Sequence, residues 1–132
     1  LDLVPFVRFT GNITSEIGAL GDYAAGSQIY VTALKYRPIE DVDVDELLEN
    51  SYDYEVFNTD DLGTATSTPY GLVVPANTVV YLVAYLDEGG NGVVQEESEP
   101  LAFANESGSS YGRIPTGTKS QSYDMELAVV EK

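Results

Sequence analysis

The sequence predicts an all-β protein, an antiparallel β-sandwich of about seven to eight strands with one short helical insertion. Runs of β-favouring residues recur between clusters of Gly, Asn, Asp, Ser and Pro, which is the pattern of a sandwich. Apolar residues make up 43% of the 132 residues, enough for one core, and the length leaves no room for a second domain. We therefore expect a single domain over residues 1–132.

The expected strands follow from hydrophobic periodicity. Residues 79–86 are apolar on both faces, which predicts a central strand that is covered on both sides. Near the chain end, Tyr123, Met125, Leu127 and Val129 alternate with more polar residues, which predicts one buried face and a strand at a sheet edge. The expected strands cover residues 5–13, 28–36, 52–57, 70–74, 79–86, 92–95, 100–104 and 122–130.

One segment, residues 39–50, predicts a helix. Pro38 precedes an acidic first turn, which suits the positive end of a helix dipole. Val42, Leu47 and Leu48 are spaced to face a core. This helix lies in an acidic insertion over residues 39–61, and one short helix leaves the class all-β.

The charge is strongly unbalanced, with 22 Asp and Glu against 6 Lys and Arg and a formal net charge of −16. Such a surface repels nucleic acid and anionic lipid, so neither is expected as a partner. Self-repulsion of this size favours a bound divalent cation, a high-salt habitat or a cationic partner. The chain has no Cys for disulfides, and no apolar run is long enough to span a membrane.

The segment that follows the expected central strand is rich in oxygen ligands. Gly89, Gly90 and Gly92 permit a tight loop after Asp87. Calcium takes about 6 to 8 oxygens from carboxylates, amides, carbonyls and water. The expected calcium ligands are Asp87, Asn91, the Val93 carbonyl, Gln95, Glu96, Glu97 and Glu99.

This loop departs from the EF-hand spacing D-x-[DN]-x-[DN]-G. Gly89 takes the place of the second ligand, and Glu99 lies one residue beyond the usual bidentate acid. The alternative is a β-hairpin that turns at Asn91 and Gly92 and continues as a solvated acidic strand. Both interpretations stay open, and the net charge favours calcium.

At this loop the sequence resembles the prealbumin-like (transthyretin-like) and carboxypeptidase-regulatory-like extracellular β-sandwiches of bacteria and archaea. In that family a hydrophobic strand such as residues 80–86 runs into D-x-N-x-N-G, followed by an acidic residue and Glu-Pro. The matching positions here are Asp87, Asn91, Gly92, Glu96 or Glu97, and Glu99 with Pro100. Residues 9–13 and 71–75 occupy the opening-strand and pre-core-strand places. A weaker likeness, in acidity and general character, is to the calcium-dependent cannula subunits that archaea assemble into extracellular tubes.

No enzymatic activity is expected. Residues 108–112 spell G-S-S-Y-G, the string of a nucleophile elbow, but that motif requires a following helix and a His base, and the chain has no His. The absence of His also removes the usual zinc and copper sites. Carboxylate pairs are so abundant that they do not indicate a glycosidase.

The 10 Tyr residues have two interpretations. Most are expected to pack their rings along the strands and point their hydroxyls outward. A row of exposed rings would instead make a platform for carbohydrate, since aromatic faces stack on the apolar faces of sugars.

The expected role is a structural subunit of an extracellular or cell-surface assembly, a homo-oligomer or polymer that calcium stabilises. The start at Leu1 suggests either a processed mature end or a trimmed chain whose signal peptide is gone, and Asn12 and Asn105 lie in glycosylation sequons. The apolar residues 1–9 are either the first strand of the sandwich or a segment donated to a neighbouring subunit, with Pro5 at the joint. The alternatives are a non-catalytic binding module for carbohydrate or protein, and a domain whose acidity reflects a high-salt habitat.

Overall fold

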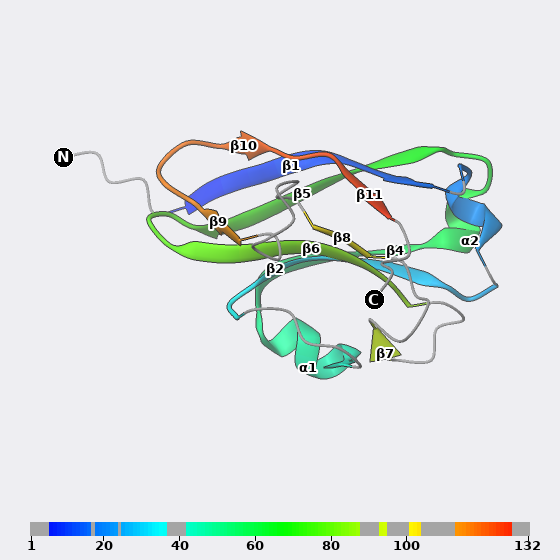
Figure 1. The fold of residues 1–132 in the computed structure, drawn as a ribbon, viewed down its shortest axis with the longest axis horizontal. Coiled ribbons are helices and arrows are strands. Elements are labelled where there is room, and N and C mark those ends of the chain that lie inside the picture. The colour runs from blue at the N-terminus through cyan, green and yellow to red at the C-terminus, as the bar shows by residue number, and fades with distance from the viewer. Residues whose placement is uncertain are drawn as a thin grey trace.

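The protein is described here from a computed structural model, which places residues 6–16, 18–23, 25–36, 42–87, 93–94, 101–103 and 113–127. Its strands form two sheets that pack face to face (Figure 1), so the predicted β-sandwich is confirmed. The first sheet contains β1 (Phe6–Ser15), β5 (Ser67–Pro75), β10 (Gln121–Ser122) and β11 (Met125–Leu127). The second contains β2 (Gln28–Leu34), β4 (Ser51–Asn58), β6 (Val79–Asp87), β8 (Leu101–Phe103) and β9 (Arg113–Pro115).

Smaller elements complete the described part of the chain. A third, two-stranded sheet consists of β3 (Val42–Asp43) and β7 (Val93–Val94). The helices are α1 (Val44–Glu49), α2 (Thr59–Leu62) and the 3₁₀ turn η1 (Leu20–Asp22). No helix among the described residues is long and apolar enough to cross a membrane.

β1 is the central strand of the first sheet. It pairs antiparallel with β5 over nine residues, from Phe6 opposite Pro75 to Thr14 opposite Ser67. On its other side it pairs with β10 and β11, and both of these pairings are parallel. The sequence led us to expect a purely antiparallel sandwich, and these two parallel pairings are the difference from that expectation.

The expected strand 122–130 is divided into β10 and β11 because the ladder is interrupted at Asp124, directly after the Tyr123 N–H has donated to the Thr10 carbonyl at 2.8 Å. The Asn12 N–H donates to Asp124 Oδ1 at 2.9 Å, so a side chain replaces a backbone acceptor. The Tyr123 carbonyl accepts the hydroxyl of Tyr70 at 2.6 Å. Gly11 lies against that carbonyl so closely that any Cβ would overlap it. The break thus depends on contacts between distant segments.

β6 is the central strand of the second sheet, as its apolar sequence predicts. The order is β4-β2-β6, and β9 and β8 share the far edge of β6, β9 beside Val79–Tyr81 and β8 beside Val83–Tyr85. The alternate residues Val80, Leu82, Ala84 and Leu86 belong to the core between the sheets.

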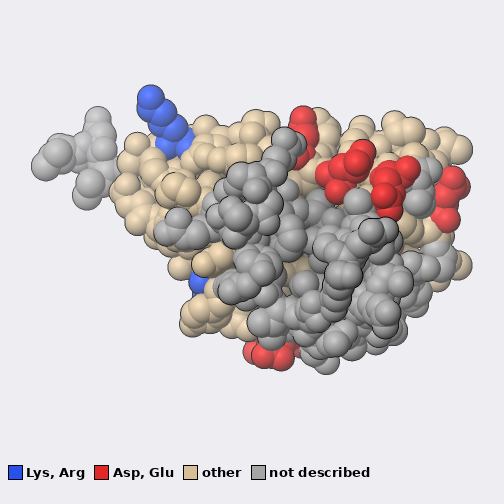
Figure 2. Space-filling model, in the orientation of Figure 1, with Lys and Arg blue, Asp and Glu red and all other residues tan. Residues whose placement is uncertain are grey.

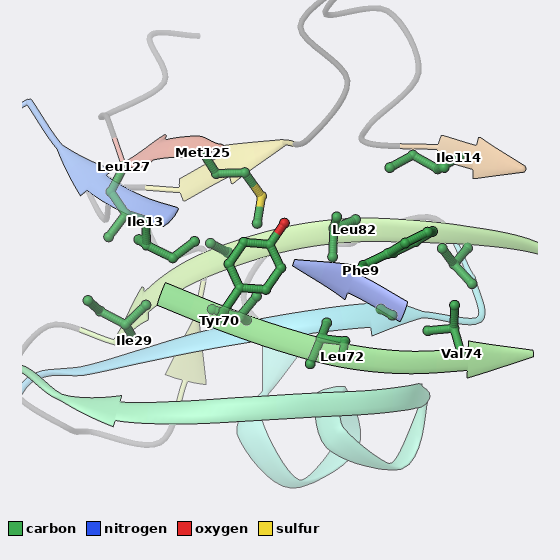
Figure 3. Close-up of a cluster of buried hydrophobic side chains, with 14 of the residues drawn as sticks. Phe9, Ile13, Ile29, Tyr70, Leu72, Val74, Leu82, Ile114, Met125 and Leu127 are labelled. Carbon is green, nitrogen blue, oxygen red and sulfur yellow. The ribbon is translucent and has the colours of Figure 1, made fainter. Parts of the chain in front are cut away.

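That core is continuous from one end of the sandwich to the other. Phe9 of β1 and Tyr123 meet edge to face, with ring centroids 5.8 Å apart and planes 80° apart. Met125 and Leu127 are buried, so the predicted alternation of the last strand is confirmed where it is described. Figure 3 shows side chains from both sheets converging here: Phe9, Ile13, Ile29, Tyr70, Leu72, Val74, Leu82, Ile114, Met125 and Leu127.

The second sheet is also covered on its outer face, where α1 lies (Figure 1). A second cluster joins Tyr30, Leu34, Val83 and Tyr85 of the sheet to Val44 and Leu47 of the helix. The expected helix 39–50 is shorter than predicted, because α1 begins at Val44 and Val42 belongs to β3, where it pairs with Val94. Leu48 is half-buried against the same cluster.

Other boundaries also differ from the expected ones. The strand expected over 28–36 ends at Leu34, where the chain bends at Lys35 and Tyr36; the Lys35 N–H still donates to the Asn50 carbonyl at 2.7 Å, next to the start of β4. The strand expected over 92–95 has two described residues, and it pairs with β3 instead of joining either main sheet. β9 was not expected because three residues show no periodicity. The G-S-S-Y-G string lies outside the described residues.

Candidate functional site

The candidate calcium loop begins at a buried carboxylate. Asp87 is the last residue of β6, lies opposite Gln28 of β2, and is 0% exposed. Carboxylates are seldom buried to this extent. Because Asp87 continues a strand held by β2, its position is set by the sheet and not by the loop that follows.

A second acidic side chain, Asp45, acts on the same tyrosine as Asp87. Tyr30, on the neighbouring strand β2, donates its hydroxyl to Gln28 Oε1 at 2.5 Å. The pKa of Tyr30 is raised, first by burial and then by the negative charges of Asp87 and Asp45. Both carboxylates therefore add negative potential at the Tyr30 hydroxyl.

Sequence reasoning did not assign Asp45 to this site. Asp45 lies in the first turn of α1, where an acidic residue is favoured by the helix dipole alone. The signal that would have identified it is the pairing of β3 with β7, which places Asp43 opposite Val93. This pairing connects the acidic insertion to the segment that follows Asp87, and β7 also lies against β6.

The expected ligands are only partly described. The side chain of Asp87 and the backbone of Val93 are placed, while Asn91, Gln95, Glu96, Glu97 and Glu99 lie outside the described residues. Within the described ranges no group of three or more acidic side chains is placed to hold a metal. The Asp87 carboxylate and the Val93 carbonyl are groups of the oxygen type that calcium takes, and the choice between an ion-binding loop and a plain hairpin stays a prediction.

A row of exposed aromatic side chains lies on β4. Tyr52 and Tyr54 are 38% and 44% exposed, and Val56 follows on the same face of the strand. The Lys35 ammonium lies over the Tyr52 ring, 5.5 Å from its centroid. The rings of Tyr70 and Tyr85 are packed in the interior as expected, but their hydroxyls do not point outward: that of Tyr70 donates to the Tyr123 carbonyl, and that of Tyr85 is buried. Among the described tyrosines, Tyr52 and Tyr54 on β4 are the neighbouring exposed pair to which the platform interpretation applies.

The amino-terminal stretch is partly integrated into the sandwich. Phe6, Val7, Arg8 and Phe9 pair with β5 as the start of β1, and the side chains of Val7 and Phe9 are buried. Residues 1–5 lie outside the described residues. Any segment donated to a neighbour would therefore have to precede Phe6.

Comparisons with known proteins give no identity for the chain. No model of a protein family matches the sequence, and no curated protein matches it. The likeness to prealbumin-like sandwiches and to cannula subunits consequently stays a prediction.

Proposed function

We propose that the protein is a structural subunit of an extracellular, calcium-stabilised assembly and has no catalytic role. The observation that carries this proposal is the buried carboxylate of Asp87 at the start of an acidic loop, in a chain with a net charge of −16. A ligand that the sheet already holds in place loses little conformational freedom when an ion binds.

The metal would be held by Asp87, Asn91, the Val93 carbonyl, Gln95, Glu96, Glu97 and Glu99. Calcium would supply positive charge at this edge of the sandwich. An ion that binds the folded chain and not the unfolded chain stabilises the fold by mass action. It would also tie the loop to β6, and through β7 to the acidic insertion at β3.

Charge neutralisation also connects calcium to assembly. On the face drawn in Figure 2, acidic side chains gather towards the end of the sandwich that carries η1 and α2. Copies of such a chain repel one another, and bound divalent cations reduce that repulsion. This supports an assembly that depends on calcium and is weakened by a chelator.

The test is a calorimetric calcium titration of the wild type, Asp87→Asn and Glu126→Gln. Glu126→Gln is the matched control, because it removes one carboxylate charge from an exposed position on β11. We expect Asp87→Asn to weaken calcium binding by at least about tenfold and the control to bind as the wild type does. Absence of binding to the wild type at millimolar calcium would refute the calcium site.

Assembly is tested by light scattering with calcium and then with chelator, on the full chain and on a variant that lacks residues 1–5. The deletion stops before Phe6 because the next residues belong to β1. We expect polymers that grow with calcium and are lost in the shortened chain. If the shortened chain still polymerises, the strand-donation route is wrong, whereas a wild type that stays monomeric refutes the assembly itself.

A second candidate function, a carbohydrate-binding module, is favoured by the exposed Tyr52 and Tyr54 on one face of β4. Its signature would be a melting temperature that rises with soluble oligosaccharides and no longer does so in Tyr52→Ala/Tyr54→Ala. Tyr36→Ala is the control, because Tyr36 is an exposed tyrosine that does not belong to β4. Stability that follows sodium chloride and ignores micromolar calcium would instead support adaptation to high salt.

A further inference from the structure

The two sheets meet along one side of the sandwich at strands β4 and β5. β4 is an edge of the second sheet, and among the described strands β5 pairs only with β1. The outer edge of β5 therefore presents backbone N–H groups that need acceptors. An edge of this kind is a template for pairing with another strand unless something covers it.

Two carboxylates of β4 cover this edge. The Gly71 N–H donates to Glu55 Oε2 at 2.9 Å, and the Val73 N–H donates to Asp53 Oδ2 at 2.8 Å. Asp53 also accepts the N–H of Tyr54 through Oδ1 at 2.9 Å. Asp53 and Glu55 are half-buried, while the neighbouring Tyr52, Tyr54 and Val56 face outward. The acidic residues of β4 thus point towards β5.

The covered donors have the geometry of a β-ladder. Gly71 and Val73 are two residues apart, so their N–H groups repeat at about 6.8 Å, the repeat of alternate carbonyls on an added strand. Two copies of this edge are self-complementary: antiparallel pairing centred on Leu72 places Gly71 of each copy opposite Val73 of the other, with mutual N–H to carbonyl bonds. Such a contact is two-fold symmetric and closes as a dimer.

We propose that Asp53 and Glu55 form a removable cover on the β5 edge, and that the uncovered edge pairs with β5 of a second copy. The cover acts in two ways. It occupies the donors that the second strand needs, and it brings four carboxylates together if two covered edges approach. The guanidinium of Arg8 also lies beside Gly71, since a Cβ added to Gly71 would be 3.3 Å from Arg8 Nη2. This inference does not depend on calcium.

The test compares the wild type with Asp53→Ala/Glu55→Ala by sedimentation velocity in the presence of a chelator. We expect the double variant to form a dimer whose fraction rises with concentration, and the wild type to show no such dimer. Asp22→Ala/Glu126→Ala is the matched control, since it removes two exposed carboxylates elsewhere and should behave as the wild type does. A double variant that keeps the wild-type circular dichroism and stays monomeric overturns the proposal.

A third substitution identifies the edge that pairs. Val73→Pro in the double variant removes the donor at Val73 while leaving β1 paired to the other side of β5, and edge positions tolerate Pro. We expect the dimer to disappear. A dimer that persists in this triple variant forms through another surface and overturns the assignment to β5.

If the alanine variant fails to fold, Asp53→Asn/Glu55→Gln provides an independent measurement. These substitutions keep acceptor oxygens and remove the charges. We expect the amide protons of Gly71 and Val73 to exchange about tenfold faster, because a bond to a charged acceptor is stronger than one to a neutral acceptor. Exchange at the wild-type rate at both amides would show that the carboxylates do not protect this edge.

Discussion

Tyr85→Phe is expected to stabilise the protein. Tyr85 lies on β6 opposite Tyr30, on the outer face that α1 covers, and is 0% exposed. Its hydroxyl has no hydrogen-bond partner within the described part of the chain. Burial raises the pKa of Tyr85 above its ordinary value. The ring contributes to packing, while the oxygen contributes a desolvation cost with no bond to offset it.

The magnitude follows from that cost. Burying an unbonded hydroxyl costs about 1–3 kcal/mol in proteins, and Phe keeps the same ring and leaves a void of only one atom. We expect the free energy of unfolding to rise by about 1 kcal/mol, which is about 4 °C in melting temperature for a domain of this size. Tyr70→Phe is the matched control, because the Tyr70 hydroxyl donates to the Tyr123 carbonyl. That variant should lose about 1–2 kcal/mol.

The assay is urea unfolding followed by far-ultraviolet circular dichroism. The midpoint should rise for Tyr85→Phe and fall for Tyr70→Phe, with the dependence on urea concentration unchanged in both. Both variants remove one hydroxyl group, so changes of opposite sign in the free energy of unfolding would distinguish a hydroxyl without a hydrogen bond from one that has a hydrogen bond. If Tyr85→Phe is destabilised as much as Tyr70→Phe, the Tyr85 hydroxyl has an acceptor in solution and the reasoning is refuted.

Three further predictions concern pH and packing. Burial raises the folded-state pKa of Tyr70 and Tyr85, so the unfolded chain loses these protons first as the pH rises. The contribution of these two groups to the free energy of unfolding should therefore be constant below about pH 10. Above that pH it should fall by up to ~1.4 kcal/mol per pH unit for each group. Urea titrations from about pH 8 to pH 11 should show a smaller slope in Tyr85→Phe, because that variant removes one of the four tyrosines whose pKa is raised by burial, Tyr30, Tyr70, Tyr85 and Tyr123. Gly11→Ala should unfold the domain or displace β10 and β11, because the new Cβ overlaps the Tyr123 carbonyl, and thermal melts will show it. Leu47→Ala on α1 should cost about 2–4 kcal/mol, measured by urea unfolding, and a stability equal to that of the wild type would mean that α1 does not cover the sheet.

The first sheet shows which contacts a sequence pattern cannot predict. The alternation around Met125 and Leu127 correctly predicts their buried face, because periodicity reports burial directly. It does not report the partner strand or its direction. The parallel pairing with β1 and the break at Asp124 depend on a side-chain bond to Asn12, which is more than a hundred residues away in the chain. Such a bond has no local signature.

For the candidate site, too, the sequence pattern identified a residue on a strand but not the distant residue that acts on the same tyrosine. Asp87 was identified because it directly follows a strand that is apolar on both faces, and the structure places it as a buried residue at the end of that strand. Asp45 was missed because it lies forty-two residues earlier, in a segment whose charge is explained equally well by exposure to solvent. The pairing of Asp43 with Val93, which connects this segment to β7, has no signature in the sequence.

The sequence nevertheless contained an indication of this arrangement. A strand that is apolar on both faces needs a cover on each side, and the opposite sheet supplies only one. The amphipathic segment around Val44 and Leu47 is the available second cover, and it packs on Val83 and Tyr85 of β6. The same strand ends at Asp87, and the first turn of this helix carries Asp45. The two predictions, a strand covered on both faces and a short acidic helix, are thus related, because the helix is the cover on one face of the strand.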